Sequence, residues 1–233
     1  MTSRARLSFV AFAVAAAAVC VRLGIWQLDR RDERLARNSA ELTERDKPPV
    51  DLGRDARPMP HRRVRVSGIY EFEREVVLRG RAFEGVPGVE LVTPLRLPGR
   101  DTAVLVHRGF VASPDAATID ASVHREAPDA QIEGLTLPIP AGSGGEPISA
   151  NGRETWRRLD LAALRRRLPY PVYETYVLVE LPAGGGGAPR RIPPPSLDEG
   201  PHLNYAIQWF AFAAIALIGS GAYLVTRRRG AAE

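Results

Sequence analysis

The chain has 233 residues, a formal net charge of +5, a sequence pI of about 9.9 and a single cysteine. One cysteine excludes an intramolecular disulfide and the paired-cysteine motifs of redox and copper proteins. Most of the net charge lies in the short terminal segments 1–6 and 226–233, so the basic pI does not indicate a nucleic-acid-binding protein.

The first apolar segment covers residues 7–26. Its first part, 7–21, follows two arginines and contains an Ala-x-Ala sequence, features that also suit a cleaved signal peptide. The apolar run continues to Trp26, which makes it about 30 Å long as a helix. Arg22 interrupts the run near its end, where a long side chain can reach the membrane interface. We therefore predict a retained transmembrane helix over 7–26, with a cleaved signal peptide as the alternative.

The second apolar segment, 204–225, lies near the C-terminus. It contains no charged residue, is about 30 Å long as a helix and ends at the basic tail 226–233. Because positive charge close to a span marks its cytoplasmic side, we expect both terminal tails in the cytoplasm. Residues 27–203 would then form an extracytoplasmic domain of a multi-pass membrane protein.

The residues between the two spans have mostly β-character. A charged helical stretch over 27–42 is expected to continue from the first span and to stop at Pro48. An amphipathic helix is predicted over Thr155–Leu168, a loop over 138–147, and a flexible Gly/Pro linker over 183–201. Short strands separated by Gly and Pro turns are expected at 63–69, 73–79, 90–97, 102–111, 130–137 and 170–181. The predicted fold class is an α+β membrane protein, with two transmembrane helices flanking an antiparallel β-rich domain that holds one or two helices.

The sequence contains none of the common catalytic signatures. It lacks an HExxH, a Gly-x-Ser-x-Gly, a phosphate loop and a GxGxxG after a strand. Three histidines are scattered without the spacing of a metal cluster: we expect His61 to be solvated, His107 to be structural, and assign no role to His124. We do not expect an enzyme.

His202 differs from the other histidines because it lies at the beginning of the second span. His202, Tyr205 and Trp209 are spaced i, i+3 and i+7, so they share one stripe of a helix. A neutral imidazole with aromatic rings deeper along the same stripe could ligate haem iron and stack on the macrocycle. The alternative is an ordinary aromatic belt at the membrane interface, in which His202 has no ligand.

A matching group of residues follows the first span. Trp26, Arg30 and Arg34 are spaced i, i+4 and i+8, so one helix face carries an indole ring and two guanidinium groups. Guanidinium groups bind carboxylates well, and haem has two propionate carboxylates. We therefore expect Arg30 and Arg34 to be partners of the propionates, and Trp26 to contribute to the same pocket.

Several motifs resemble those of the surfeit locus protein 1 family, a family of membrane factors for the biogenesis of haem-copper cytochrome oxidase. The resemblance covers the whole chain, and its first and last motifs bracket a domain of the right length. The matching segments are Leu23-Gly24-Ile25-Trp26-Gln27-Leu28-Asp29-Arg30, Val66-Ser67-Gly68-Ile69-Tyr70, Gly88 to Leu95, Val106 to Ala112, the set Asn151, Trp156 and Asp160, and the set His202, Tyr205, Ala206 and Trp209.

This resemblance implies haem binding, with haem A as the expected cofactor, and help in inserting haem into the large subunit of cytochrome c oxidase. It implies that His202 is the axial ligand of the haem iron, and that haem A synthase and membrane lipid are further partners. The chain departs from the family pattern at His107, Phe110 and Ala112, and it has Arg34 where the family has lysine.

Two other functions remain open from the sequence. A non-haem membrane scaffold could stabilise oxidase assembly intermediates, since Gly219 and Gly221 would allow close helix packing. A copper-delivery factor is the weaker alternative, because paired cysteines and a methionine cluster are absent from the sequence.

Overall fold

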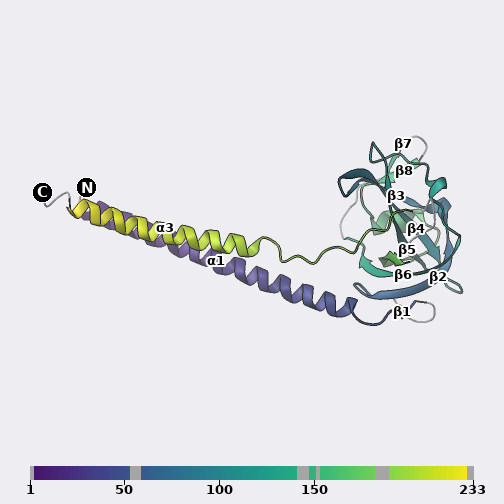
Figure 1. Ribbon diagram of the computed structural model, residues 1–233, viewed down its shortest axis with the longest axis horizontal. Coiled ribbons are helices and arrows are strands. Elements are labelled where there is room, and N and C mark those ends of the chain that lie inside the picture. Colours follow the sequence, from purple (N-terminus) through teal and green to yellow (C-terminus); the bar gives the residue numbers. More distant parts are fainter. Residues whose placement is uncertain (1–2, 53–58, 141–146, 151–152, 182–188, 230–233) are drawn as a thin grey trace. The chain divides into compact units, whose positions relative to one another are not determined.

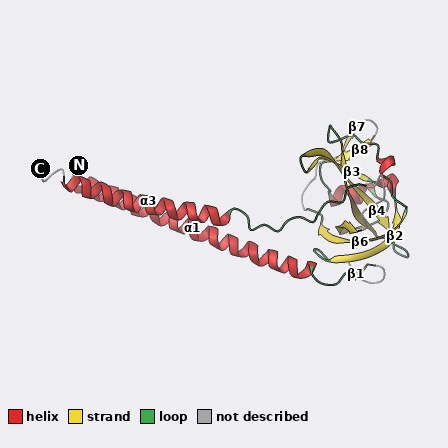
Figure 2. Ribbon diagram, viewed as in Figure 1, coloured by secondary structure: helices red, strands yellow, loops and turns green. Residues whose placement is uncertain are grey.

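A computed structural model describes residues 3–52, 59–140, 147–150, 153–181 and 189–229 of the chain. These residues belong to two compact units (Figure 1). One unit combines Met1–Ala40 with Ser196–Glu233 and is helical, and the other is Glu41–Pro195 and is rich in strands (Figure 2). The expected division into apolar terminal helices and a β-rich middle is therefore present.

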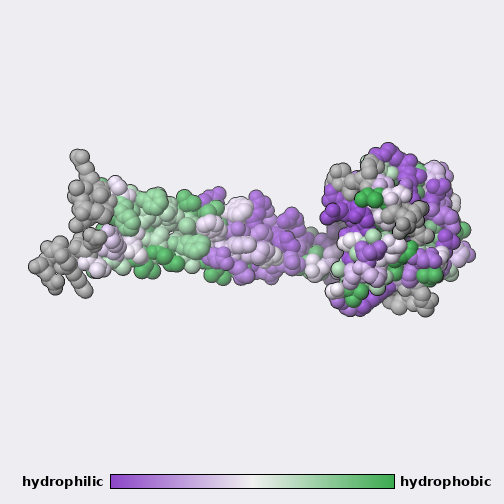
Figure 3. All heavy atoms as spheres, turned by 90° about the horizontal axis from the view of Figure 1, so that it is seen from above, coloured by the Kyte–Doolittle hydropathy of each residue, from purple (hydrophilic) through white to green (hydrophobic). Residues whose placement is uncertain are grey.

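The helical unit contains α1 (Ser3–Arg45) and α3 (His202–Arg229), each with an apolar stretch long enough to cross a membrane. Helix α1 runs through Gln27 without a break, which confirms that the charged stretch continues the first apolar segment. It ends shortly before Pro48, since proline disfavours helical geometry in the residue that precedes it. On the face drawn in Figure 3, apolar side chains gather over one part of the helix pair and polar side chains over the next part.

The two helices are antiparallel and pack along a seam with alternating spacings of three and four residues. The rings of Phe9 and Tyr223 contact each other at a tilt, with centroids 5.3 Å apart, and Gly24 lies against Phe210. This spacing is typical of helices that pack knobs into holes. The buried or partly buried positions with this spacing are Val10, Ala13, Ala17, Cys20, Gly24, Gln27, Arg31, Arg34 and Asn38 on α1, and His202, Ala206, Trp209, Ala213, Ala216, Ser220 and Tyr223 on α3. Ala16, Leu23, Leu28, Leu35 and Leu224, beside this seam, are also partly buried. Small residues dominate the apolar part of this seam, which permits the close approach.

The second unit consists mainly of strands. In chain order its elements are β1 (Val50–Asp51), β2 (Arg63–Tyr70), η1 (Phe72–Arg74), β3 (Val76–Phe83), β4 (Val86–Arg96), β5 (Ala103–Ala112), η2 (Ala121–His124), β6 (Asp129–Pro138), β7 (Ile148–Ala150), β8 (Arg153–Trp156), α2 (Leu161–Arg167) and β9 (Val172–Leu181). The strands expected at 63–69, 90–97, 102–111 and 130–137 are confirmed within a few residues. The strand expected at 73–79 begins later, at Val76, because a 3-10 turn precedes it.

Five strands close into a ring. They pair in the order β2-β6-β9-β5-β4, and β4 pairs again with β2, while β3, β8 and β7 extend the sheet from β4. The sheet is mixed, which corrects the antiparallel prediction: β1–β2, β3–β8 and β5–β9 are parallel pairs. Apolar alternation shows that a segment is a strand but carries no information about the direction of its neighbour, so this feature depends on the connections.

One apolar cluster fills the interior of the ring. In β2, buried and exposed residues alternate perfectly, so that Val64 and Val66 point inward. Each of the five strands of the ring contributes to this cluster, which contains Leu52, Val64, Val66, Tyr70, Leu95, Leu97, Val104, Val106, Ile132, Val177 and Val179. Because a closed ring leaves only short edges, this core holds the unit without a disulfide.

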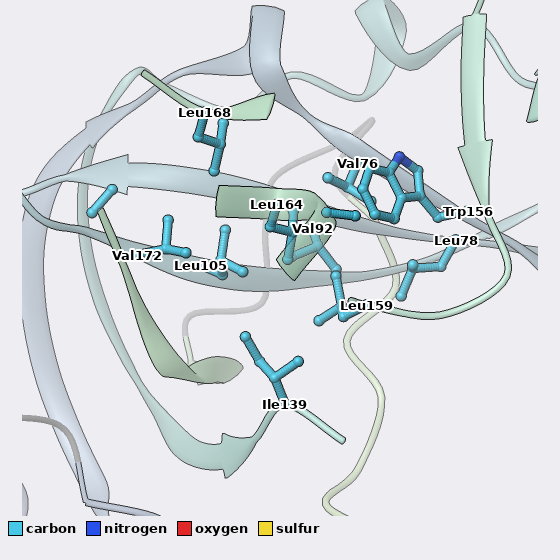
Figure 4. Packing of buried hydrophobic residues seen from close by; sticks show 12 residues of the cluster. Val76, Leu78, Val92, Leu105, Ile139, Trp156, Leu159, Leu164, Leu168 and Val172 are labelled. Carbon is cyan, nitrogen blue, oxygen red and sulfur yellow. The ribbon is translucent and has the colours of Figure 1, made fainter. Parts of the chain in front are cut away.

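A second apolar cluster lies under α2 (Figure 4). The helix expected over Thr155–Leu168 is wrong in its first part. Trp156 belongs to strand β8, where it is 1% exposed and points into this cluster beside Leu78 and Val76. Helix α2 begins only at Leu161, because the side chain of Asp160 accepts a hydrogen bond from the backbone N–H of Ala163 and caps the helix.

The chain between β9 and α3 was predicted to be a Gly/Pro linker over 183–201. Residues 182–188 of this segment lie outside the described part, as does Asn151 of the motif set. Residues 192–200 form no regular element, in keeping with the prolines there. Before them, Arg190 exchanges two backbone hydrogen bonds of 2.8 Å with Phe110, which attaches the middle of the predicted linker to β5.

Candidate functional site

The imidazole of His202 lies at the first residue of α3 and contacts α1. Its Nδ1 atom is 2.9 Å from the side-chain oxygen of Gln27. Within the described residues, no hydrogen bond is made to the other ring nitrogen, Nε2. The imidazole is partly buried in the seam, so one nitrogen is engaged by α1 and the other is available to a ligand.

A tight turn precedes His202 and shapes the surroundings of its ring. Gly200 has a φ of +70°, a backbone conformation that glycine adopts without strain. A Cβ atom at this position would lie 3.3 Å from Cδ2 and 3.5 Å from Nε2 of His202. A residue with a side chain would therefore be strained at this position and would press on the Cδ2 edge of the ring.

An acidic segment just before α3 binds the arginines of α1. Arg34 donates to the backbone oxygen of Asp198 at 2.8 Å and also forms an ion pair with its carboxylate. Arg31 donates to the carboxylate of Glu199 at 2.7 and 3.1 Å. Arg34, expected to bind a propionate, thus already has a carboxylate partner within the chain.

Arg30 and Trp26 share a face of α1 that lies outside the seam. The guanidinium of Arg30 is 5.8 Å from the centre of the Trp26 ring, and its Nη1 is 2.7 Å from Glu33. Trp26 is 43% exposed. The spacing of Trp26, Arg30 and Arg34 placed all three on one stripe, but the structure puts Arg34 nearer to the seam than the other two.

The three residues of the α3 stripe also separate. His202 and Trp209 occupy seam positions, whereas Tyr205 is 47% exposed. Trp209 makes an edge-on contact with Phe212, with ring centroids 5.9 Å apart. The seam selects positions four and three residues apart, so it includes 202, 206 and 209, and leaves Tyr205 on a neighbouring face.

Gln27 contacts His202 and lies inside the first motif, but it was not among the residues expected at the candidate site. Two signals were available. It follows Trp26 in the motif, and it lies three residues after Gly24 and four before Arg31, which is the spacing of the seam. A polar residue at a seam position next to the apolar segment requires a hydrogen-bonding partner.

The other histidines lie in the β-rich unit and have structural surroundings. His107 is 3% exposed, and its Nε2 is 3.1 Å from the carboxylate of Glu90, in agreement with a structural role. The expectation that His61 is solvated is wrong, because its Nδ1 lies 2.8 Å from the carboxylate of Glu41. Across the described residues there is no group of three or more His, Cys, Asp or Glu that could hold a metal ion.

Comparison with known proteins gives consistent results. A family model described as the SURF1 family matches residues 14–214. The chain is 26% identical over 218 residues to a SURF1-like protein of Rickettsia felis, covering 90% of this chain and 92% of the relative. It is 28% identical over 223 residues to an uncharacterized SURF1-like protein of Mycobacterium bovis, covering 89% and 79% of the two chains. A SURF1-like protein of Monosiga brevicollis is 26% identical over 227 residues, with coverages of 89% and 83%.

The family match includes most of α1, the whole β-rich unit and the beginning of α3. Gln27 of α1 and His202 of α3, which contact each other, both lie within the matched residues. The match spans well over half of the chain, and the relatives are covered over most of their own length. The chain therefore belongs to the SURF1 family.

Proposed function

We propose that this protein is a membrane-anchored, non-enzymatic assembly factor for haem-copper cytochrome c oxidase that binds haem A and aids its insertion into the large oxidase subunit. Family membership supports the link to oxidase assembly. The observation that carries the haem proposal is the geometry of His202, whose Nδ1 contacts Gln27 while Nε2 has no hydrogen bond within the described residues. Imidazoles that ligate metals commonly have their second nitrogen engaged in this way.

In this proposal the protein carries haem and passes it on. The residues of the candidate site have the chemical groups that bind haem. Nε2 of His202 would supply a nitrogen ligand to the iron. Tyr205 and Trp26 are exposed aromatic rings on which a macrocycle could stack, and Trp209 supports the ligand from the seam. Arg30 and Arg34 would bind propionates in competition with Glu33 and Asp198, their partners in the chain.

The proposed location is the bacterial inner membrane, with both termini in the cytoplasm and the β-rich unit outside. The two apolar helices and the arginines in both terminal tails support this topology. Alkaline phosphatase and green fluorescent protein fused after residue 195 and after residue 233 test it. We expect phosphatase activity only at the first position and fluorescence only at the second; the opposite pattern would contradict the topology.

The haem proposal is tested by purifying the protein from cells that make haem A. We expect a Soret band in the wild-type spectrum and extraction of haem A from the pure protein. His202→Ala should lose the band, while the matched control His124→Ala, in the β-rich unit, should retain it. Absence of the band from the wild type, or equal bands in wild type and His202→Ala, would refute the site.

A scaffold without haem is the second candidate. It is favoured by one observation, namely that the cations expected to bind propionates already pair with Asp198 and Glu33. The two functions differ in the behaviour of His202→Ala. If haem delivery is the function, this variant should still co-purify with the large subunit and with haem A synthase but should yield oxidase deficient in haem. A scaffold predicts normal oxidase from the same variant.

A further inference from the structure

The chemical groups of His202 and Gln27 determine which atom donates the hydrogen bond between them and which accepts it. The side-chain oxygen of Gln27 faces Nδ1 at 2.9 Å. An amide oxygen carries only lone pairs and can only accept a hydrogen bond. Nδ1 must therefore carry the proton in this contact, and in a neutral imidazole the other nitrogen, Nε2, is then left with a lone pair.

Both partners are held in place by their helices. Gln27 lies on the seam one turn after Gly24, at which α3 approaches so closely that a Cβ would meet the ring of Phe210 at 2.6 Å. His202 follows the turn at Gly200 and lies one turn before Ala206, which is 1% exposed at the seam. The close packing at Gly24 and Ala206 therefore fixes the positions of the amide and the imidazole along the two helices, so that they lie side by side.

We propose that Gln27 is a positioning residue that selects the Nδ1–H tautomer of His202, and thereby directs the Nε2 lone pair toward the iron of the bound haem. This inference rests on the proposed function for the identity of the ligand, but the tautomer itself is a property of the haem-free protein. A glutamine with its amide nitrogen toward Nδ1 would have the opposite effect, since Nδ1 would accept and Nε2 would carry the proton.

The first experiment measures the tautomer in the full-length, haem-free protein by ¹⁵N NMR of the imidazole, with His202 assigned from the spectrum of His202→Ala. We expect a protonated Nδ1 and a bare Nε2 in the wild type. Gln27→Leu should lose this preference, whereas Gln208→Leu, which replaces an exposed glutamine of α3, should keep it. A protonated Nε2 in the wild type, or an unchanged tautomer in Gln27→Leu, would overturn the inference.

The second experiment measures haem affinity and reduction potential. Removal of a hydrogen-bonding partner of a metal-ligating histidine costs about 10- to 100-fold in affinity, and we expect a loss of this size for Gln27→Leu. Gln27→Glu retains an oxygen acceptor, so it should restore affinity to near that of the wild type. Its negative charge should also make the imidazole a stronger donor and lower the reduction potential. Equal losses in both variants would indicate a merely structural role and would overturn the inference.

The two experiments separate the two proposals. If the wild type binds no haem, the proposed function fails, and the tautomer measurement still decides whether Gln27 orients the imidazole. If the wild type binds haem through His202 but Gln27→Leu binds it equally well, the proposed function stands and the role of Gln27 is refuted.

Discussion

Arg108 donates from Nη2 to the carboxylate of Glu75 at 2.7 Å, and the two side chains are 0% and 6% exposed. The same guanidinium donates to the hydroxyl of Thr93 at 2.9 Å and to Glu126 at 3.1 Å, and it lies 4.9 Å from the centre of the Phe72 ring. Arg108 lies where the pairing register between β4 and β5 shifts, and its guanidinium is 5.8 Å from the centre of the Tyr70 ring, which belongs to the apolar core, so this charged cluster lies within the β-rich unit beside that core.

Replacement of Arg108 should therefore destabilise the β-rich unit strongly. Arg108→Met leaves the buried carboxylate of Glu75 without its charged partner, which costs about 3–5 kcal/mol in comparable buried pairs. The measurement is the free energy of unfolding by denaturant. Arg65→Met is the matched control: Arg65 pairs with Glu133 at 2.9 Å but is 56% exposed, and we expect a loss below about 1 kcal/mol. Equal losses would contradict the assignment of a buried cluster.

The free energy of unfolding of the β-rich unit should depend on pH because of Glu90. Burial alone would raise the pKa of Glu90, but the hydrogen bond and charge of His107 and the charge of Arg81 outweigh it, so the pKa lies below its ordinary value of 4.5. A carboxyl group whose pKa is lower in the folded state stabilises the fold above its unfolded pKa, and this contribution is lost as the pH falls through the folded pKa.

We therefore expect wild-type stability to decrease as the pH falls below about 4.5, and Glu90→Gln to show a shallower decrease in that window. Denaturant titrations between about pH 3 and pH 7 would measure this difference. Glu174→Gln, which removes a 77% exposed carboxylate, is the control and should leave the slope unchanged. An identical slope in wild type and Glu90→Gln would refute the prediction.

Close packing of the two helices should depend on Gly24. A Cβ at this position would meet the Phe210 ring at 2.6 Å, whereas a Cβ at Gly219 or Gly221 would meet nothing within 4 Å. Gly219 and Gly221, which the sequence suggested for close helix packing, therefore do not mediate the packing of α3 against α1. We expect Gly24→Leu to separate the helices and weaken haem retention, and Gly219→Leu to have no effect on either.

Site-directed spin labels at Ser8 and Thr226 would report the separation of the helices, and the Soret band of the same samples would report haem. Haem retention by Gly24→Leu at the wild-type level would show that the helix seam does not support the site.

Tyr205 and Trp209 should behave differently even though they share a sequence motif. Trp209 occupies the seam, so Trp209→Ala should both loosen the helix pair and weaken haem binding. Tyr205 is 47% exposed, so Tyr205→Ala should weaken haem binding alone. Thermal unfolding in detergent, followed by circular dichroism in haem-free protein, separates the two effects: a lower Tm is expected only for Trp209→Ala.

Asp198 should compete with a haem propionate for Arg34. Their ion pair is largely exposed, and exposed pairs contribute about 0–1 kcal/mol. Asp198→Asn should therefore increase haem affinity by up to about 5-fold. Arg34→Gln should decrease it, and Glu33→Gln should act in the same direction as Asp198→Asn through Arg30. A haem titration measures all three, and unchanged affinity in Arg34→Gln would exclude Arg34 from the site.

Much of the organisation could be predicted because it depends on short segments of the chain. The length of an apolar run and the period of apolar residues are local properties, and they located both long helices and most strands. Trp156 is the exception, since its spacing with the apolar residues after it suits a helix, yet pairing with β3 and burial beneath α2 hold it in a strand.

The amino-acid sequence alone was enough to predict two apolar helices around a β-rich unit, and to place His202, Tyr205, Trp209, Trp26, Arg30 and Arg34 near the outer ends of the two apolar segments. The packing of α3 against α1, in contrast, is what makes His202 and Trp209 face α1 while Tyr205 does not, and what brings Gln27, 175 positions away, into contact with the imidazole. Helical periodicity defines which residues share a face of one helix. The choice of the face that packs, and of its partner, depends on contacts between segments far apart in the chain, such as the approach of Phe210 to Gly24.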